Sequence, residues 1–379
     1  MRVAMVTGSY PPQPCGVGDY THRLVQQMKS SGVAVDVITT KSIAPRNEDE
    51  VKYELSDWRI SSWREGVKWI AARNYDLIHI QYPARFYGYL PDLALLTWMV
   101  RRSLPEIPIV VTLHEFRITH FLRKMTAAAI AHYANAIVLT AESELRRFEQ
   151  LLWWMKGKVH LIRLAVVVPT VQVTSEERET LRKSHGFRAD DVVIVFFGFL
   201  HPNKGIERLV ASFALVHARR PAARLLVISM FNPDTDTYHR QMAQLVREQG
   251  IEDVVTWAGY APHEQVSRLL SMADLGVLPY EDGVSFRRLS FMTMLSHGLP
   301  TVTTVGHTAL SEMDLREGEN VLGVSAKGTP ERLAARLVDL VDSPGLRQRL
   351  AHGGRLWAKP YQWEAILKES VQLYNSLIA

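Results

Sequence analysis

The sequence predicts an α/β protein made of two doubly wound domains, each with a parallel sheet covered by helices. Short apolar, β-rich runs alternate with segments of helical periodicity along nearly the whole chain. The alternation is interrupted once, near residues 166–185, by a linker and a strongly charged stretch. At 379 residues the chain is also longer than one ordinary hydrophobic core requires. We therefore expect a first domain over residues 1–170 and a second over 171–360.

Near-continuous apolar runs are typical of parallel strands that are buried on both faces. In the first domain they predict strands at Val3–Thr7, Val33–Thr39, Asp76–Gln81, Ile109–His114, Ala136–Thr140 and Val159–Arg163. In the second domain they predict strands at Val192–Phe197, Ala223–Ser229, Val254–Trp257, Leu275–Leu278, Thr301–Thr304 and Val321–Val324. Segments such as Gly18–Ser30 and Ser61–Arg73 have helical spacing, and Trp363–Ile378 is an amphipathic helix after Pro360 that either domain could hold.

The composition is that of a soluble, cytoplasmic protein. We expect no signal peptide and no membrane-spanning segment, and the single cysteine, Cys15, fits a reducing compartment. The net charge of +5 is uneven, since residues 1–175 hold 21 Lys and Arg against 15 Asp and Glu. A basic first half suggests an anionic partner, such as a phosphorylated acceptor or a lipid headgroup surface. An ordinary solvated face would explain the charge as well.

The stretch from Leu278 to Thr304 predicts an anion site at the start of a helix. The helix is expected from about Phe286 to His297, and Gly298 and Pro300 end it. Free backbone N–H groups and the helix dipole favour negative charge at such a start. The side chains that would assist are two hydroxyls and two guanidinium groups, those of Ser285, Ser290, Arg287 and Arg288. Phosphate is the simplest ligand for this combination.

Other candidate residues follow predicted strands. Gly16 and Gly18, in GVGDYT, would let a ligand approach a helix start, although the motif lacks the third glycine of a dinucleotide fingerprint and a plain turn is the alternative. Lys204, beside Gly205, could reach a phosphate or be a surface lysine. His114 ends one strand, and His79 and Gln81 end another. No spacing of His, Cys or carboxylates predicts a metal site.

Two segments, 117–133 and 146–163, combine aromatic and basic residues. Trp153 and Trp154, close to Lys156 and Lys158, could seat on the inner face of a membrane as a peripheral contact. The alternative, which the sequence favours slightly, is that both tryptophans are core or domain-interface residues.

Taken together in chain order, these segments resemble the family-4 (group 1) retaining glycosyltransferases, which have the GT-B fold. The matching segments cover nearly the whole chain and are PPQPCGVGDYT, DLIHIQYP, VVTLHEF, GFLHPNKGIERL, VTWAGYAPHEQVSRLLSMADLGVLPY and SHGLPTVTT. The YQWE segment resembles the entry to the family's last helix. The resemblance implies that residues 361–379 pack back on the first domain.

The resemblance implies a cleft between the domains that holds a nucleotide-sugar, with a UDP- or GDP-sugar as donor substrate and no metal or separate cofactor. Lys204 would bind the donor diphosphate, and the loop of Gly16, Val17 and Gly18 would approach the same group. His114 would lie beside the donor sugar, and Tyr260 would border the base. The acceptor would be a glycan, lipid-linked or small-molecule hydroxyl.

The chain departs from the family pattern at three places. Phe199 stands where an arginine is usual, five residues before the lysine, and Arg163-Leu164-Ala165 replaces Pro-Asn-Gly. The family's Glu-x7-Glu pair falls on Ser285 and Thr293. We expect Arg287 and Arg288 to offset the missing arginine, and Asp282, or less so Glu281, to replace the first glutamate.

The sequence therefore predicts a hexosyltransferase-type enzyme in which Lys204, His114 and Asp282 carry the chemistry. The cofactor-binding set would be completed by the residues around the predicted helix start, including Ser285, Phe286, Ser290 and Thr293. A non-catalytic nucleotide-sugar or glycan-binding protein of the same fold is an alternative, since fold does not guarantee activity. A nucleotide-sugar epimerase of that fold is another.

Overall fold

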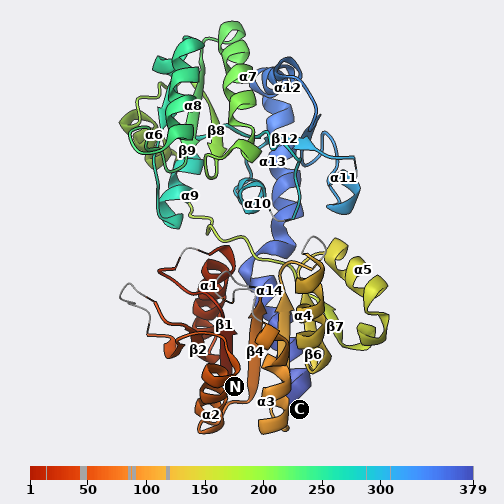
Figure 1. Cartoon of the computed structure of the whole chain (residues 1–379). Helices are drawn as coiled ribbons and strands as arrows, with labels where there is room; N and C mark the ends of the chain where they lie inside the picture. The colour runs from red at the N-terminus through yellow and green to blue at the C-terminus, as the bar shows by residue number, and fades with distance from the viewer. Residues whose placement is uncertain are drawn as a thin grey trace. The chain divides into compact units, whose positions relative to one another are not determined.

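The computed structural model describes residues 1–13, 15–42, 49–83, 87, 91–116, 120–286, 288–307 and 309–378. The chain divides into two compact units (Figure 1). Unit 1 is Met1–Ala165 together with Trp363–Ala379, and unit 2 is Val166–Gln362. The break in the strand–helix pattern placed the first boundary at residue 170, but unit 2 begins at Val166, whose backbone N–H donates to the Tyr361 carbonyl of unit 2 at 2.8 Å. The last helix belongs to unit 1.

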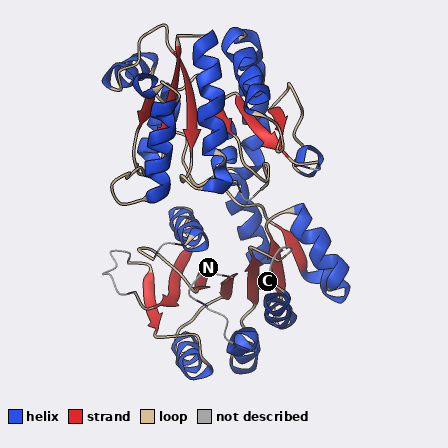
Figure 2. Ribbon diagram, turned by 45° about the horizontal axis from the view of Figure 1, so that its top comes forward, coloured by secondary structure: helices blue, strands red, loops and turns tan. Residues whose placement is uncertain are grey.

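Unit 1 contains a seven-stranded parallel sheet in the order β3-β2-β1-β4-β5-β6-β7. Its strands are β1 (Arg2–Thr7), β2 (Ala34–Thr40), β3 (Val51–Leu55), β4 (Leu77–Tyr82), β5 (Ile109–Leu113), β6 (Ala136–Leu139) and β7 (Val159–Leu161). Its helices are α1 (Gly16–Ser30), α2 (Ile60–Ala71), α3 (Leu96–Ser103), α4 (Phe121–His132), α5 (Glu142–Leu151) and α14 (Trp363–Ile378), with 3-10 turns η2 (Pro91–Leu95) and η3 (Trp153–Lys158). Helices flank the sheet, as Figure 2 shows.

Unit 2 contains a six-stranded parallel sheet in the order β10-β9-β8-β11-β12-β13. Its strands are β8 (Val192–Phe197), β9 (Ala223–Ile228), β10 (Val255–Trp257), β11 (Leu275–Leu278), β12 (Thr301–Val305) and β13 (Leu322–Ser325). Its helices are α6 (Ser175–Ser184), α7 (Ile206–Arg219), α8 (Thr237–Glu248), α9 (His263–Met272), α10 (Leu289–Ser296), α11 (Ala309–Glu312), α12 (Pro330–Asp342) and α13 (Pro344–Ala358). The 3-10 turns are η4 (Pro202–Lys204), η5 (Glu252–Val254) and η6 (Lys359–Tyr361).

The two parallel sheets confirm the predicted fold class, and each sheet has one point where the strand order reverses. In unit 1 that point lies between β1 and β4, and in unit 2 it lies between β8 and β11. Loops diverge there at the carboxyl ends of the strands, so open α/β sheets bind ligands at this position. The loops that carry Gly16 and Lys204 follow β1 and β8, respectively.

Four local expectations were incomplete or wrong. Strand β3 was not expected, because it is an edge strand whose half-buried and exposed residues alternate up to the buried Leu55. The helix expected from Phe286 begins at Leu289, because the Arg288 N–H closes a turn on the Ser285 carbonyl. The helix expected from Gly18 begins at Gly16.

The fourth concerns the adjacent tryptophans. The core interpretation of Trp153 and Trp154 is wrong, since their exposed fractions are 71% and 56%. Among the described residues, no helix is both long and apolar enough to span a bilayer.

Candidate functional site

Unit 2 gathers basic residues at its switch point. The turn η4, which ends at Lys204, follows β8, and the loop that holds Asp282 and Arg288 follows the neighbouring strand β11. Gly205 lets these two segments meet, since its φ is +69° and an added Cβ would lie 1.9 Å from the Pro279 carbonyl oxygen. Only glycine suits both constraints. Lys204 is therefore placed against the end of β11.

The ring of Tyr280 lies beneath both Lys204 and Arg288. The Tyr280 side chain is fully buried, and its hydroxyl lies 2.7 Å from the Ser290 hydroxyl. The ammonium nitrogen of Lys204 lies 5.2 Å from the centre of the Tyr280 ring, and the guanidinium carbon of Arg288 lies 4.5 Å from it. Both distances are within the range of cation–π attraction. The ring thus brings two cations together at the strand edge.

The surroundings of Lys204 weaken its hold on its proton. Burial and the positive charge of Arg288, opposed by the carboxylate of Asp282, together lower the pKa of Lys204 to about 8. Asp282 also forms an ion pair with Arg288, although its own side chain is 59% exposed. One carboxylate faces two cations here, so the cluster favours an added anion.

A second ion pair adjoins the first. Arg208, on α7, contacts Glu281 at 2.8 Å, while its Nη1 atom is buried with no hydrogen-bond partner among the described residues. Arg208 and Tyr280 were not expected from the sequence. Tyr280 lies two residues after the predicted strand Leu275–Leu278, and this position was the available signal.

The other residues expected near this helix start have different surroundings. Phe286 packs on Trp357 and Tyr361, with ring centres 6.5 and 5.9 Å away. Thr293 is 1% exposed within α10. Ser285 is half-buried, and Arg287 lies outside the described residues. Of the predicted set, the structure therefore brings together Lys204, Asp282, Arg288 and Ser290, which surround Tyr280.

Three exposed apolar side chains line the same edge of unit 2. Phe199, Met230 and Tyr260 follow β8, β9 and β10, which are neighbours in the sheet, and their exposed fractions are 70%, 52% and 75%. Large apolar side chains at a strand-end edge suit a flat ring such as a nucleobase. Tyr260 was expected there from the sequence, whereas Phe199 and Met230 were not.

In unit 1, His114 follows β5 and is held by a buried polar network. Its Nε2 lies 2.7 Å from the Oε1 of Gln81, while the amide nitrogen of Gln81 lies 3.2 Å from the Nε2 of His79. The other nitrogen of His79 lies 2.5 Å from the hydroxyl of Tyr374, on α14. Because Gln81 presents its carbonyl oxygen, His114 Nε2 carries the proton and Nδ1 is left as an acceptor.

Burial keeps both histidines neutral. It lowers the pKa of His114 to about 4, and that of His79 to about 3 with a further contribution from His114. A neutral imidazole can orient a hydroxyl group by hydrogen bonding, but it holds no proton to donate as an acid near pH 7.

The start of α1 adjoins His114 in unit 1. The ring of Tyr20, on α1, meets the His114 ring edge-on with centres 5.6 Å apart. The N-cap residue, Cys15, makes no side-chain hydrogen bond to the first turn. An added Cβ on Gly16 would meet nothing within 4 Å, whereas one on Gly18 would lie 3.0 Å from the Ser9 carbonyl oxygen. Val17 packs partly against the core.

Groups of His, Cys and carboxylate side chains that could hold a metal ion do not occur within the part of the chain that the structure describes. The donors gathered at the strand ends are instead cations, hydroxyls and backbone N–H groups, which suit a phosphate.

Comparisons with known proteins agree with this chemistry. A family model described as "Glycosyltransferase Family 4" matches residues 14–168, and one described as "Glycosyl transferases group 1" matches residues 191–343. D-inositol 3-phosphate glycosyltransferase of Corynebacterium urealyticum is 23% identical over all of this chain and 96% of its own length. Alpha-D-kanosaminyltransferase of Streptomyces kanamyceticus is 25% identical over 84% of each chain.

Solved structures match the fold over the full length. Sucrose-phosphate synthase from Thermosynechococcus elongatus superposes with a TM-score of 0.74 at 20% identity, covering 100% of this chain and 99% of that one. HepE of Anabaena, solved with UDP and glucose, gives 0.74 at 16% identity, covering 99% and 100%. The two family models, the named relatives and the fold agree: the chain belongs to the group 1, family-4 glycosyltransferases and is a glycosyltransferase with the GT-B fold.

Proposed function

We propose that the enzyme transfers a hexose, with retention of configuration and without a bound metal ion, from a nucleotide-diphosphate sugar to an acceptor hydroxyl. The observation that supports this most is the pairing of Lys204 and Arg288 over Tyr280, at the switch point of unit 2. HepE was solved with UDP-glucose, which favours a nucleotide-sugar here as well. We assign a UDP- or GDP-sugar as the donor and no separate cofactor.

In the proposed reaction, the bond between the sugar's anomeric carbon and the diphosphate oxygen breaks, and negative charge develops on the diphosphate. Lys204, Arg288 and the backbone N–H groups at the start of α10 stabilise that charge. The acceptor oxygen bonds to the anomeric carbon on the face that the diphosphate leaves. Its proton passes to the departing phosphate oxygen, so the step needs no side-chain base.

Unit 1 has two roles in this proposal. His114, which is neutral and oriented by Gln81, positions the donor sugar by accepting a hydrogen bond from a sugar hydroxyl at Nδ1. The free backbone N–H groups of α1, from Gly16 to Gly18, bind phosphate oxygens, because the first turn has no side-chain cap. Open space at Gly16 supports that role.

A donor panel tests the proposal. Thermal-shift measurements with UDP, GDP, ADP and their sugars identify the base, since a ligand that binds the native state raises apparent stability. Incubation of the best donor with and without EDTA then tests metal independence, and the anomeric configuration of the product tests retention. Binding of the donor without turnover would contradict the proposed transfer reaction. Release of an altered free sugar would indicate an epimerase.

We also propose a cytoplasmic location with a peripheral contact to an anionic membrane surface. Trp153 and Trp154 are exposed beside Lys156, and Arg146 and Arg147 are exposed on the preceding helix α5. Exposed tryptophans flanked by basic residues are typical of interfacial binding. Such a contact suits a lipid-linked acceptor. The wild-type protein should sediment with anionic vesicles, and the W153S/W154S variant should not. Equal sedimentation of the two proteins would contradict the membrane contact.

A further inference from the structure

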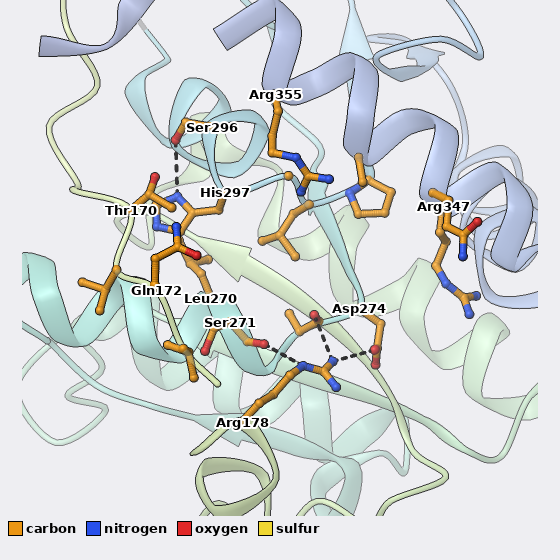
Figure 3. Close-up of a pocket in the computed structure, with 18 residues that line it drawn as sticks. Thr170, Gln172, Arg178, Leu270, Ser271, Asp274, Ser296, His297, Arg347 and Arg355 are labelled. Carbon is orange, nitrogen blue, oxygen red and sulfur yellow. Dashed lines mark hydrogen bonds and ion pairs between the residues drawn. The ribbon is translucent and has the colours of Figure 1, made fainter. Parts of the chain in front are cut away.

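A cavity of about 550 Å³ lies within unit 2, away from the proposed donor site (Figure 3). It is bounded by the linker before α6, the end of α9, the turn between α10 and β12, and one side of α13. Asp274 lies in its wall just before β11 begins, whereas Pro279 follows the end of that strand. The two positions are five steps apart along an extended chain, or about 16 Å. The cavity therefore opens at the opposite edge of the sheet.

The charge of its lining is positive. Arg178, Arg347 and Arg355 lie on three sides of the cavity (Figure 3). Asp274 is the only carboxylate in the lining, and it is already neutralised. Its Oδ1 contacts Arg178 at 2.8 Å, and its Oδ2 contacts Arg182, behind the wall, at 3.1 Å. Among the residues that line the cavity, the cations thus outnumber the carboxylates.

Two of the three guanidinium groups are fixed in place. Arg178 donates to the Ser271 carbonyl at the end of α9, and Arg347 donates to the Leu340 and Val341 carbonyls at the end of α12. Both side chains keep N–H groups for a ligand. The bonds of Arg178 use its Nε and Nη2 and leave Nη1, and those of Arg347 use its Nη1 and leave Nε and Nη2. Fixed guanidinium groups bind a tetrahedral anion with little loss of entropy.

Arg355 makes no hydrogen bond or ion pair with any other residue in the ranges that the structure describes. Its guanidinium lies over Gly298, where an added Cβ would stand 1.8 Å from Nη1. Gly298 also has a φ of +68°. Glycine at this position therefore both ends the helix and leaves room for the Arg355 side chain. All five N–H donors of Arg355 are available to a ligand.

The uncharged residues of the lining indicate which group the ligand carries besides its phosphate. Uncharged polar side chains are present, including Thr170, Gln172, Ser271, Ser296 and Gln348. The lining contains no Phe, Tyr or Trp on which a nucleobase could stack. The volume is within the usual range for small-molecule sites. We propose that this cavity is a second binding site, separate from catalysis, for a phosphate monoester of a sugar or polyol.

Calorimetric titration with glucose 6-phosphate tests the site. We expect saturable binding with a Kd below about 1 mM. R355Q should weaken it at least tenfold, while UDP binding stays unchanged. R349Q is the matched control, because Arg349 is an exposed residue of the same helix that does not line the cavity.

Further arms separate the possible outcomes. Q172L should weaken glucose 6-phosphate binding without affecting inorganic phosphate, since Gln172 is one of the uncharged polar residues of the lining that would contact the sugar hydroxyls. Absence of saturable binding, or equal weakening by R349Q, overturns the site. Equal binding of inorganic phosphate overturns the assignment of a sugar. Loss of binding in K204A places the ligand at the donor site instead and overturns the proposal, while the donor proposal itself is judged by UDP alone.

Discussion

The side-chain oxygen of Gln81 lies 2.7 Å from Nε2 of His114 and decides which nitrogen of that histidine carries the proton. The two residues end neighbouring strands, β4 and β5, so the sheet itself sets their separation. The amide nitrogen of Gln81 is engaged by His79, which prevents the amide from turning over. Gln81 is therefore a positioning residue for His114.

Replacing Gln81 should impair turnover through His114. Q81L leaves a buried N–H without an acceptor, which costs about 1–3 kcal/mol, so we expect kcat/KM to fall about tenfold or more. Q81E should raise the pKa of His114 from about 4 toward neutrality, because a carboxylate stabilises the imidazolium. The pH–rate profile of Q81E should then bend between about pH 5 and 8, where the wild type shows no bend from His114. Unchanged profiles in both variants would refute the role.

Donor binding should weaken as Lys204 loses its proton. Its pKa in the free enzyme is about 8, and only the ammonium form attracts the diphosphate. The Kd for UDP should therefore rise toward tenfold per pH unit above about pH 8, since the phosphates of UDP are already ionised there. Titrations between about pH 7 and 9.5 measure this dependence.

K204R is the matched control for this dependence, because a guanidinium keeps its charge over the whole range. K204A should cost about 2–4 kcal/mol of transition-state stabilisation. A turnover change below about threefold in K204A would remove Lys204 from the diphosphate site.

Two glycine substitutions should differ sharply in their effect on stability. G205A places a Cβ 1.9 Å from the Pro279 carbonyl oxygen at a positive φ, so we expect at least about 2 kcal/mol of destabilisation. G16A meets open space and should change stability by less than about 0.5 kcal/mol. If α1 binds the diphosphate, G16A should nevertheless weaken UDP binding about tenfold. Thermal melts and UDP titrations of both variants measure these effects, and unchanged UDP binding in G16A would exclude that contact.

Asp282 distinguishes sugar recognition from simple charge pairing. In the proposed role its carboxylate holds hydroxyls of the donor sugar, so D282N should lower turnover about tenfold while UDP binding persists. If Asp282 only pairs with Arg288, its negative charge reduces the attraction of the two cations for the diphosphate. D282N would then strengthen UDP binding without loss of turnover. Parallel titrations with UDP and UDP-glucose, alongside initial rates, separate the two. The second pattern would refute the assignment.

Part of the candidate site was visible in the sequence. Lys204, Arg288 and Ser290 were selected because basic and hydroxyl side chains next to a strand end and a helix start indicate an anion site, and these residues meet around Tyr280. Tyr280 itself was not selected, because an aromatic residue beside a buried strand is ordinarily core. Its role depends on two cations, each contributed by a different loop.

The family, the two parallel sheets and nearly all the strands follow from the order of the residues alone. Continuous apolar runs and helical periodicity are local properties, so they can be read without knowing what packs against what. The missed strand β3 is the exception, since its residues alternate at a sheet edge. The end of α10, just before Gly298, was equally local, because it depends on the positive φ of that one residue.

Which side chains meet depends instead on how the elements pack in three dimensions. His79 lies against Tyr374, 295 residues away in the chain, and Lys204 lies over Tyr280 across two loops. It also decided that Trp153 and Trp154 are exposed and that α10 begins after Phe286, whose ring packs on Trp357. Hydrogen bonds and cation–π contacts act over a few ångströms, so their partners are set by how distant elements pack, which no local pattern records.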